Sequence, residues 1–384
     1  MKRAATLSVA AARRLAVAAQ GFAAGAKSRP LLGALRDLSC VQLDSISAVE
    51  RSHRIVLASR AGPFPKDAEW ALLRQGKAFE YWAHEACLLP IEDFPLLRFR
   101  MRERRIHHWY GPVIDKDPKL ARSVLSAIRE RGPLGSRDFE DKRKGGEGRS
   151  GTMWNWKPAK RMLDALWTAG DLMIAGRRGF QRQYELTERL IPKRLLEAPL
   201  LSEDEHLRGL ALRAVRARGL LTASGVLEHY RIRGGTRRIR PQLDALVASG
   251  ELRTLALEDG GAPVFAPAQA PLDAKPRDVA VLLSPFDNLL WDRDFAARLF
   301  RFEHLIEVYK PQPQRRFGYY VLPLLVGDEI LGRVDLKSER THGILRIKSF
   351  HRESRVRQSA RLDDRLDEAA ARLATDIGLE RVMR

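Results

Sequence analysis

A glutamine and an aspartate two residues apart, Gln42 and Asp44, have the types and spacing that hydrolytic chemistry requires. A carboxamide beside a carboxylate can hold and activate a water molecule. A fixed negative charge can also stabilise the cationic sugar that develops as a glycosidic bond breaks. The competing interpretation is that Asp44 is simply a cap, because aspartate is common just before a helix.

The elements around this pair are expected to hold it in an extended segment. Helices are predicted over residues 8–22, 31–38 and about 47–59, as in a helix-turn-helix. Ser47 and Glu50 fit a capping box at the start of the third of these helices. Gln42 and Asp44 then lie just before that helix, where residues i and i+2 share one face while Leu43 anchors inward.

The charge of the chain favours a polyanionic partner. The sequence has 384 residues with 68 Lys and Arg against 48 Asp and Glu, a net charge of +20. Such an excess favours nucleic acid first and an anionic membrane surface second. The membrane alternative is weak because no apolar run approaches the ~18–20 residues of a transmembrane helix. Arg13 and Arg14 interrupt the N-terminal apolar stretch, so we do not expect a secretory signal.

Cysteine usage indicates a reducing compartment. Cys40 and Cys87 are the two cysteines of the chain, too few for a four-thiolate zinc site or a disulfide framework. We therefore expect a cytoplasmic protein that uses no metal.

An internal repeat organises the middle of the chain. Residues 127–132 (AIRERG) are echoed by residues 214–219 (AVRARG), and Leu163–Leu166 is echoed by Leu243–Leu246. The first copy also carries a polar insert over residues 141–151, which predicts a surface loop. Each copy is expected to form a helix, a short helix, a third helix and a β-hairpin.

Helix-turn-helix followed by a hairpin is the winged-helix pattern, in which the third helix enters a DNA groove and the hairpin touches the backbone. Basic residues are concentrated in these elements of both copies. The predicted DNA-binding residues there are Lys157, Lys160, Arg161, Arg177, Arg178 and Arg182 in the first copy and Arg237, Arg238 and Arg240 in the second. The alternative is that they form solvated faces of a winged helix that binds protein.

The C-terminal block is expected to be rich in strands. Strands are predicted over residues 280–284, 319–326, 329–335 and 343–350, with a closing helix over 361–377. This block contains four carboxylates that could form a metal cluster: Asp287, Asp292, Asp294 and Asp335. The interpretation we prefer is that they form ion pairs with Arg293, Arg298 and Arg333.

The predicted fold class is therefore α+β, with tandem winged-helix domains and a β-rich C-terminal region. The expected domains are residues 1–118, which carry the Gln-Leu-Asp segment, the two winged-helix units 119–198 and 199–270, and the C-terminal region 271–384.

Several motifs, in order along nearly the whole chain, resemble the AlkZ/YcaQ family of bacterial winged-helix DNA glycosylases. They are residues 42–46 (QLDSI), 51–53 (RSH), 80–86 (EYWAHEA), 284–287 (SPFD) with 291–293 (WDR), 317–323 (FGYYVLP) and 332–337 (GRVDLK). The Asp form of the Gln-apolar-Gln/Asp motif is closer to the YcaQ-like branch than to the AlkZ branch.

The resemblance implies a monofunctional glycosylase that excises N7-alkylated guanine and unhooks interstrand crosslinks during DNA repair. It implies that Gln42 and Asp44 are the catalytic pair, that Arg51 and His53 belong to the DNA-binding site, and that no cofactor or metal is needed. The expected partner is double-stranded DNA, bound by a monomer at the cytoplasmic nucleoid.

Two other functions fit part of the pattern. A winged-helix transcription regulator would use the same helices without catalysis, but it usually needs a dimer to read two half-sites. A metal-dependent nuclease would need clustered carboxylates, and the sequence offers no convincing set.

Overall fold

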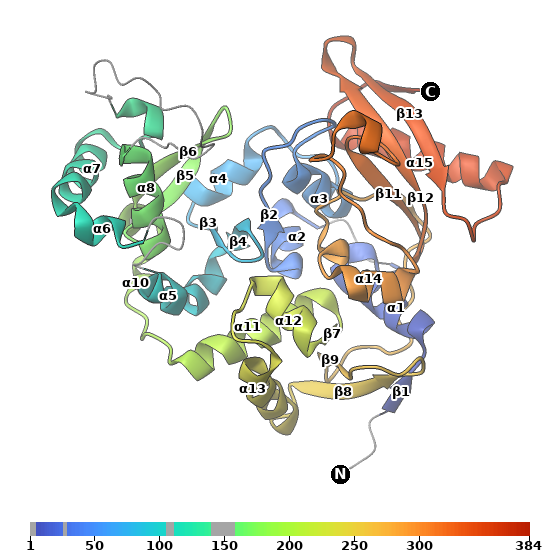
Figure 1. Ribbon diagram of the computed structural model, residues 1–384, viewed down its shortest axis with the longest axis horizontal. Helices are drawn as coiled ribbons and strands as arrows, with labels where there is room; N and C mark the ends of the chain where they lie inside the picture. Colours follow the sequence, from blue (N-terminus) through green and yellow to red (C-terminus); the bar gives the residue numbers. More distant parts are fainter. Residues whose placement is uncertain (1–4, 26–28, 105–110, 140–157) are drawn as a thin grey trace. The chain divides into compact units, whose positions relative to one another are not determined.

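The computed structural model describes residues 5–25, 29–104, 111–139 and 158–384 (Figure 1). The chain forms two compact units, each built from segments that are not consecutive in the sequence. The larger unit comprises Met1–Pro65, Ala83–Leu88 and Leu207–Arg384, and the smaller unit comprises Lys66–Trp82 and Leu89–His206. Helices and sheets occur in both, which confirms the α+β class. The division into four consecutive domains stays a prediction.

The N-terminal part of the larger unit has three helices, as predicted. They are α1 (Val9–Val17), which continues into the π-helix η1 (Ala18–Phe22), α2 (Leu31–Leu38) and α3 (Ser52–Ala61). Ser8 caps α1 by accepting a hydrogen bond from the Ala11 N–H at 3.1 Å. Strand β2 (Val41–Gln42) lies between α2 and α3, so the extended segment predicted around Gln42 is confirmed.

The predicted start of the third helix is wrong, because α3 begins at Ser52 rather than Ser47. The intervening residues follow tertiary contacts instead of helical ones. Val49 is fully buried in the core of the C-terminal sheet, and its carbonyl accepts a hydrogen bond from the Ser338 hydroxyl at 2.6 Å. Glu50 binds Arg340 at 2.7 Å and makes no capping box.

The three helices and the hairpin predicted for the second repeat are present in the predicted order, with the additional strand β7 between the first two helices. This repeat contains α11 (Glu203–Arg218), β7 (Leu221–Thr222), α12 (Ala223–Tyr230), α13 (Thr236–Ala248), β8 (Leu252–Leu257) and β9 (Val264–Pro267). The N-terminal strand β1 (Ala5–Leu7) adds to this hairpin in parallel with β8, giving the order β1-β8-β9-β7. That contribution from the start of the chain was not predicted.

The C-terminal region is a five-stranded sheet in the order β10-β11-β12-β13-β14. Its elements are β10 (Ala280–Leu282), α14 (Arg293–Phe300), β11 (Val321–Val326), β12 (Glu329–Glu339), β13 (Ile344–Arg352), α15 (Ala360–Asp376) and β14 (Arg381–Met383). Helix α15 lies against the sheet (Figure 1). Its Leu366 and Leu373 join Leu345 of β13 in one buried apolar cluster. The four predicted strands and the closing helix are confirmed.

The smaller unit contains the first repeat. Its elements are α4 (Ala68–Arg74), β3 (Ala78–Trp82), η2 (Ile91–Asp93), α5 (Phe94–Glu103), α6 (Val113–Lys116), α7 (Pro118–Arg131), η3 (Ser136–Asp138), α8 (Pro158–Ala169), β5 (Leu172–Arg178), β6 (Gln181–Leu186), α9 (Thr187–Leu190) and α10 (Lys193–Leu196). Strand β4 (Ala86–Pro90) begins in the larger unit and ends here. Helices α7 and α8 and the β5–β6 hairpin agree with the prediction, and the polar insert over residues 141–151 lies outside the described residues.

No helix in the described part of the chain is both long enough and apolar enough to span a bilayer.

Candidate active site

Two short antiparallel strands hold the Gln-Leu-Asp segment in the larger unit. On β2 and β4, Gln42 lies opposite Cys87. The Leu43 N–H donates to the Ala86 carbonyl at 2.8 Å, so the pairing continues one residue beyond β2. Leu43 is buried, and in an extended segment its neighbours Gln42 and Asp44 point to the opposite side. Gln42 is as buried as Leu43, each at 8% exposure, and the convergence of the Gln42 and Asp44 side chains stays a prediction.

Asp44 is half-buried and begins a tight turn. Its Oδ1 accepts a hydrogen bond from the Ile46 N–H at 2.8 Å, an arrangement in which an aspartate closes its own turn. Burial raises the pKa of the Asp44 carboxyl above its ordinary value, although the Ile46 N–H, Arg51 and His53 act to lower it. A carboxylate held partly out of water acts more strongly on a nearby cation than one in bulk solvent.

The start of α3 supports this segment from behind. The buried Ser52 hydroxyl donates to the Gln42 carbonyl at 3.1 Å, and the Arg51 guanidinium donates to the Ser45 carbonyl. His53 is 1% exposed, so in this structure it does not reach a DNA phosphate. We therefore drop His53 from the proposed DNA contacts and regard Arg51 first as a support for the turn after Asp44.

A second support comes from the SPFD motif noted in the sequence. The Asn288 amide donates to the Cys40 carbonyl at 2.9 Å, just before β2. Its neighbour Asp287 is fully buried and pairs with Arg60 at the end of α3, with oxygen–nitrogen distances of 2.5 and 2.9 Å. Charged hydrogen bonds of this kind are strong when both partners are desolvated. The motif thus fixes both α3 and the approach to Gln42.

Two arginines predicted to bind DNA from the first hairpin are engaged elsewhere. In the smaller unit, Arg177 and Arg182 each donate to Glu80 at 2.7 Å, and Arg182 also contacts Asp164. Burial would raise the pKa of Glu80, yet the two guanidinium groups outweigh burial and lower it. The ring of Trp167 lies 4.0 Å below the Arg182 guanidinium. We therefore withdraw Arg177 and Arg182 from the proposed DNA contacts, because both complete a buried charge network.

The other DNA contacts predicted in the first repeat differ in how exposed they are. Lys157 lies outside the described residues. Lys160 is half-buried and Arg161 exposed on α8, and Arg178 is exposed at the turn of the hairpin.

In the second repeat the predicted basic residues lie together on α13 and at its start. Arg237 and Arg240 are exposed and Arg238 is half-buried. Arg238 donates to the Arg233 carbonyl at 2.8 Å, and Arg240 pairs with Asp244 at 2.9 Å. Exposed pairs of the latter kind are weak, so a phosphate can replace Asp244. This helix remains the best-placed part of the predicted DNA surface.

The four C-terminal carboxylates do not gather around a common point. Asp292 caps α14 through the Phe295 N–H at 3.0 Å, and Asp287 pairs with Arg60. Two of the predicted partners were wrong, because Arg298 instead binds Asp259 at 2.5 Å and Arg333 binds Glu353 at 2.8 Å; pairing with Arg293 stays a prediction. Among the described residues no group of three or more His, Cys, Asp or Glu side chains is arranged to hold a metal ion.

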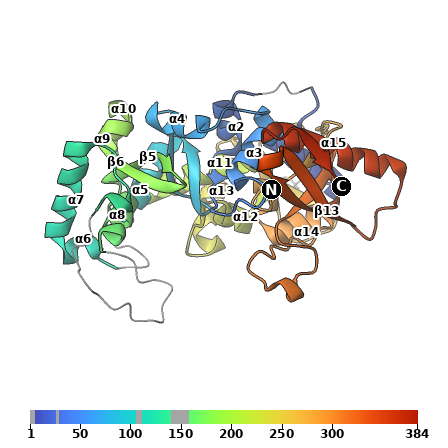
Figure 2. The same cartoon turned by 90° about the horizontal axis from the view of Figure 1, so that it is seen from above.

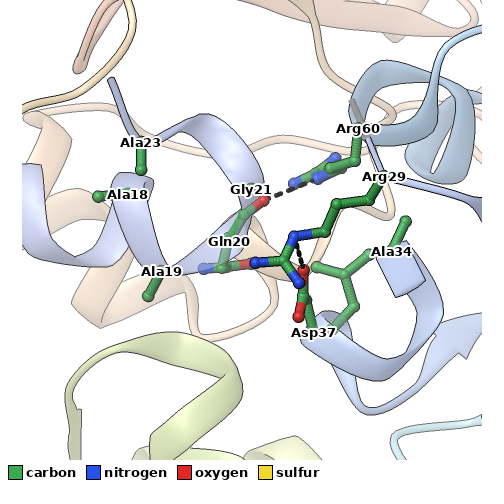
Figure 3. Close-up of a pocket in the computed structure, with 10 residues that line it drawn as sticks. Ala18, Ala19, Gln20, Gly21, Ala23, Arg29, Ala34, Asp37 and Arg60 are labelled. Atoms are coloured by element: carbon green, nitrogen blue, oxygen red, sulfur yellow. Dashed lines mark hydrogen bonds and ion pairs between the residues drawn. The ribbon is translucent and has the colours of Figure 1, made fainter. Parts of the chain in front are cut away.

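A cavity of 230 Å³ lies at the other end of α3 (Figure 3). It is bordered by the buried amide of Gln20, the Arg29–Asp37 ion pair at 2.9 Å and the Arg60 side chain. Arg60 stands eight residues after Ser52, which corresponds to about 12 Å along a helix. The cavity shares no residue with the Gln-Leu-Asp segment and does not form part of the candidate site.

Sequence reasoning missed two residues that support the candidate site. Ser52 lies inside the RSH motif and Asn288 directly follows the SPFD motif. Their side chains donate hydrogen bonds to the Gln42 and Cys40 carbonyls, and no sequence pattern predicts such contacts.

The protein thus has an α+β fold and a Gln42–Asp44 segment whose backbone is held by hydrogen bonds from Ser52 and Asn288. It also has helices with exposed arginines, α8 and α13. Residues 35–375 match the family described as DNA glycosylase AlkZ-like. The chain belongs to this family, which confirms the resemblance and makes the protein a DNA repair glycosylase that acts on DNA.

A solved structure has the same overall fold. It is the DNA glycosylase AlkZ of Streptomyces sahachiroi, with a TM-score of 0.65 and 14% sequence identity over 98% of this chain and 99% of that one. The match to a glycosylase family does not favour the transcription regulator considered above.

Proposed function

We propose that the protein hydrolyses the N-glycosidic bond of N7-alkylated guanine in duplex DNA, including guanine held in an interstrand crosslink, and leaves an abasic site. Alkylation at N7 gives guanine a positive charge, so the base leaves without needing a strong general acid. The enzyme must mainly hold the DNA, stabilise the sugar as it becomes cationic, and deliver water.

Asp44 and Gln42 would divide these tasks. The Asp44 carboxylate faces the sugar and stabilises its positive charge as the bond to the base breaks. The Gln42 amide and Asp44 together hold the water that attacks the sugar carbon, and Asp44 takes its proton. The observation that supports this assignment best is the extended backbone at Gln42, which pairs with β4, because residues i and i+2 of an extended segment share one face.

A monofunctional reaction fits the composition of the site. A glycosylase that also cuts the strand needs an amine to form a Schiff base with the sugar. The segment from Val41 to His53 contains no lysine, and hydrolysis by water needs none. We also propose that one chain suffices, working as a monomer at the cytoplasmic nucleoid, since one chain carries two basic repeats.

The test is release of a base from duplex DNA that carries a single 7-methylguanine or a nitrogen-mustard crosslink, revealed by alkaline cleavage at the abasic site. Wild type should produce cleavage only after alkali, and EDTA should not change the rate. Asp44→Asn should lose about 10²–10³-fold in single-turnover rate, the usual loss when one transition-state electrostatic contact is removed. Gln42→Ala should be impaired as well.

Asp37→Asn is the matched control, because Asp37 is a partly buried carboxylate of the same unit, paired with Arg29 outside the candidate site. It should keep wild-type activity. Wild type that binds the DNA but releases no base would refute the proposal, and full activity of Asp44→Asn would refute the assigned site.

A further inference from the structure

The cavity at the end of α3 contains a buried amide group that no described residue binds. The Gln20 side chain lines this cavity (Figure 3), and the residue is 1% exposed. Within the described part of the chain, neither its amide oxygen nor its amide nitrogen has a hydrogen-bond partner. Exchanging the two atoms would therefore supply no bond either. Such a position is unfavourable unless a molecule in the cavity binds the amide.

The backbone at Gln20 is fixed by α3. The Gln20 carbonyl accepts a hydrogen bond from Arg60 Nε at 3.1 Å, and Arg60 is itself paired with the buried Asp287. Gly21 has a φ of 93°, and a Cβ there would lie 2.7 Å from the Arg60 side chain, so this close approach requires glycine. Both residues belong to the π-helix η1, a rare conformation that is often found at functional sites. Packing against Arg60 therefore places the Gln20 side chain at the cavity.

The walls of the cavity are small and mostly apolar. Helix α2 packs on η1 and on α3, and it lies beside α3 in both views of the chain (Figure 1, Figure 2). The apolar lining residues are Ala18, Ala19, Ala23, Ala34 and Leu38. The Arg29 and Asp37 side chains, 58% and 29% exposed, bind each other, and Arg60 is bound by Asp287. Of the described lining residues, Gln20 is thus the one whose buried polar side chain is unused.

Size and hydrogen bonding together define the ligand. The cavity has a volume of 230 Å³, and an apolar cavity of about 150 Å³ already accommodates benzene. An amide donates through its nitrogen and accepts through its oxygen, so its best partner offers an acceptor beside a donor. Nucleobases carry such an edge, and glutamine binds adenine through two bonds of this kind. A DNA glycosylase releases a free base at each turnover, so its own reaction supplies a molecule of this class.

We propose that this cavity binds a free nucleobase, with the Gln20 amide donating and accepting hydrogen bonds along one edge of the base and the small apolar side chains packing on its faces. This site is separate from the proposed function, because the cavity shares no residue with the Gln-Leu-Asp segment. It holds a base that has already been released and takes no part in breaking the glycosidic bond.

Equilibrium dialysis of the full chain with radiolabelled 7-methylguanine measures this binding without any DNA. Wild type should bind the base saturably. Caffeine is a planar purine of similar size that has no N–H donor. It should displace the label at least about tenfold less effectively than unlabelled 7-methylguanine, because the hydrogen bond to the Gln20 amide oxygen is lost.

The Gln20→Met variant tests the amide itself. Methionine has a similar length and no amide, so the affinity for 7-methylguanine should fall by about tenfold or more. The free variant should melt at or above the wild-type temperature, because an unpaired buried amide has been removed. The matched control is Gln242→Met, since Gln242 is a buried glutamine of the same unit that accepts a hydrogen bond from Arg208 at 3.1 Å. It should keep wild-type affinity for the base.

Two further variants locate the bound base. Ala34→Leu adds bulk to the wall that α2 contributes and should weaken binding while the Gln20 amide is intact. Asp44→Asn should bind the base as wild type does, because Asp44 does not line the cavity.

The outcomes for the cavity and for the reaction are distinct. Absence of saturable binding to wild type would mean that the cavity holds water only, and it would overturn the nucleobase site. So would unchanged affinity in Gln20→Met or Ala34→Leu, or loss of binding in Asp44→Asn, which would place the base at the candidate active site. Wild type that releases no base from 7-methylguanine DNA would instead overturn the proposed function and leave the dialysis result untouched.

Discussion

The Asp44 carboxylate is subject to two opposing effects. Its proposed role requires a negative charge, because only the ionised form stabilises a cationic sugar. Its partial burial disfavours that charge, and the nearby Arg51 guanidinium offsets part of the loss. Such a balance is common in active sites, where a charge is most effective when it is incompletely solvated.

The pH dependence of excision follows from this balance. Burial raises the pKa of Asp44 above the 3.8 of a free aspartate, so the carboxylate is protonated as the pH falls through that raised value. The single-turnover rate on 7-methylguanine DNA should therefore decrease on the acid side, with a midpoint above 3.8. The measurement is the rate against pH, corrected for spontaneous base loss.

Asp44→Asn should give a lower and flatter profile, because its amide does not titrate. A wild-type rate that stays constant down to pH 4 would contradict the assignment of the essential charge to Asp44.

At the scale of elements, the arginines of the first hairpin form buried ion pairs inside the protein instead of binding a ligand. Arg177 and Arg182 come from β5 and β6, and their charges converge on Glu80 of β3, a residue with no exposed surface. Three charges buried together need each other, because removal of one leaves the others desolvated and unpaired. The network therefore specifies how the hairpin packs on β3.

Glu80→Ala should destabilise the smaller unit by about 3–5 kcal/mol, the usual cost of breaking a buried charge pair from one side. Chemical denaturation followed by tryptophan fluorescence measures this, since Trp167 lies beneath Arg182. Glu197→Ala is the matched control: its pair with Lys193, at 3.5 Å, is exposed and should contribute less than about 1 kcal/mol. Equal stabilities for the two variants would rule out a structural role for the network.

Much of the fold could be predicted because its signals are local. Helix α7 and the start of α8 at Pro158 follow from apolar spacing and from proline at the first turn. The pairing of β1 with β8 and of β14 with β13 joins segments far apart in sequence, and no local pattern specifies such partners.

At the candidate site, too, local features could be predicted from the sequence and tertiary contacts could not. Leu43 was expected to point inward, and the structure buries it. The capping box at Ser47 failed because burial of Val49 in the C-terminal sheet outweighs a local helical preference. The fate of Arg177 and Arg182 depended on Glu80, about 100 residues earlier in the chain. Charge patterning alone does not distinguish an arginine that meets phosphate from one that meets a buried carboxylate.

At the scale of the whole molecule, the net charge of +20 favours binding to DNA, and the number of phosphates that the protein contacts sets how strongly binding depends on salt. Each phosphate neutralised by Lys or Arg releases condensed counterions, so the logarithm of the binding constant falls with the logarithm of salt concentration by about 0.9 per contact. The exposed Arg237 and Arg240 of α13 are the residues through which we expect part of this effect. The arginines of the Glu80 network should contribute little.

The double variant Arg237→Ala/Arg240→Ala should therefore bind duplex DNA more weakly and reduce the salt slope by about 2, because two phosphate contacts are lost. The loss should be equal for methylated and unmodified duplexes, since phosphate contacts carry no information about the base. Fluorescence anisotropy at several salt concentrations measures both quantities. Lys193→Ala, which removes an 85% exposed charge outside the proposed surface, should leave the slope unchanged. If the double variant keeps the wild-type slope, α13 does not face the DNA backbone, and the exposed Arg161 of α8 and Arg178 of the first hairpin become the next candidates.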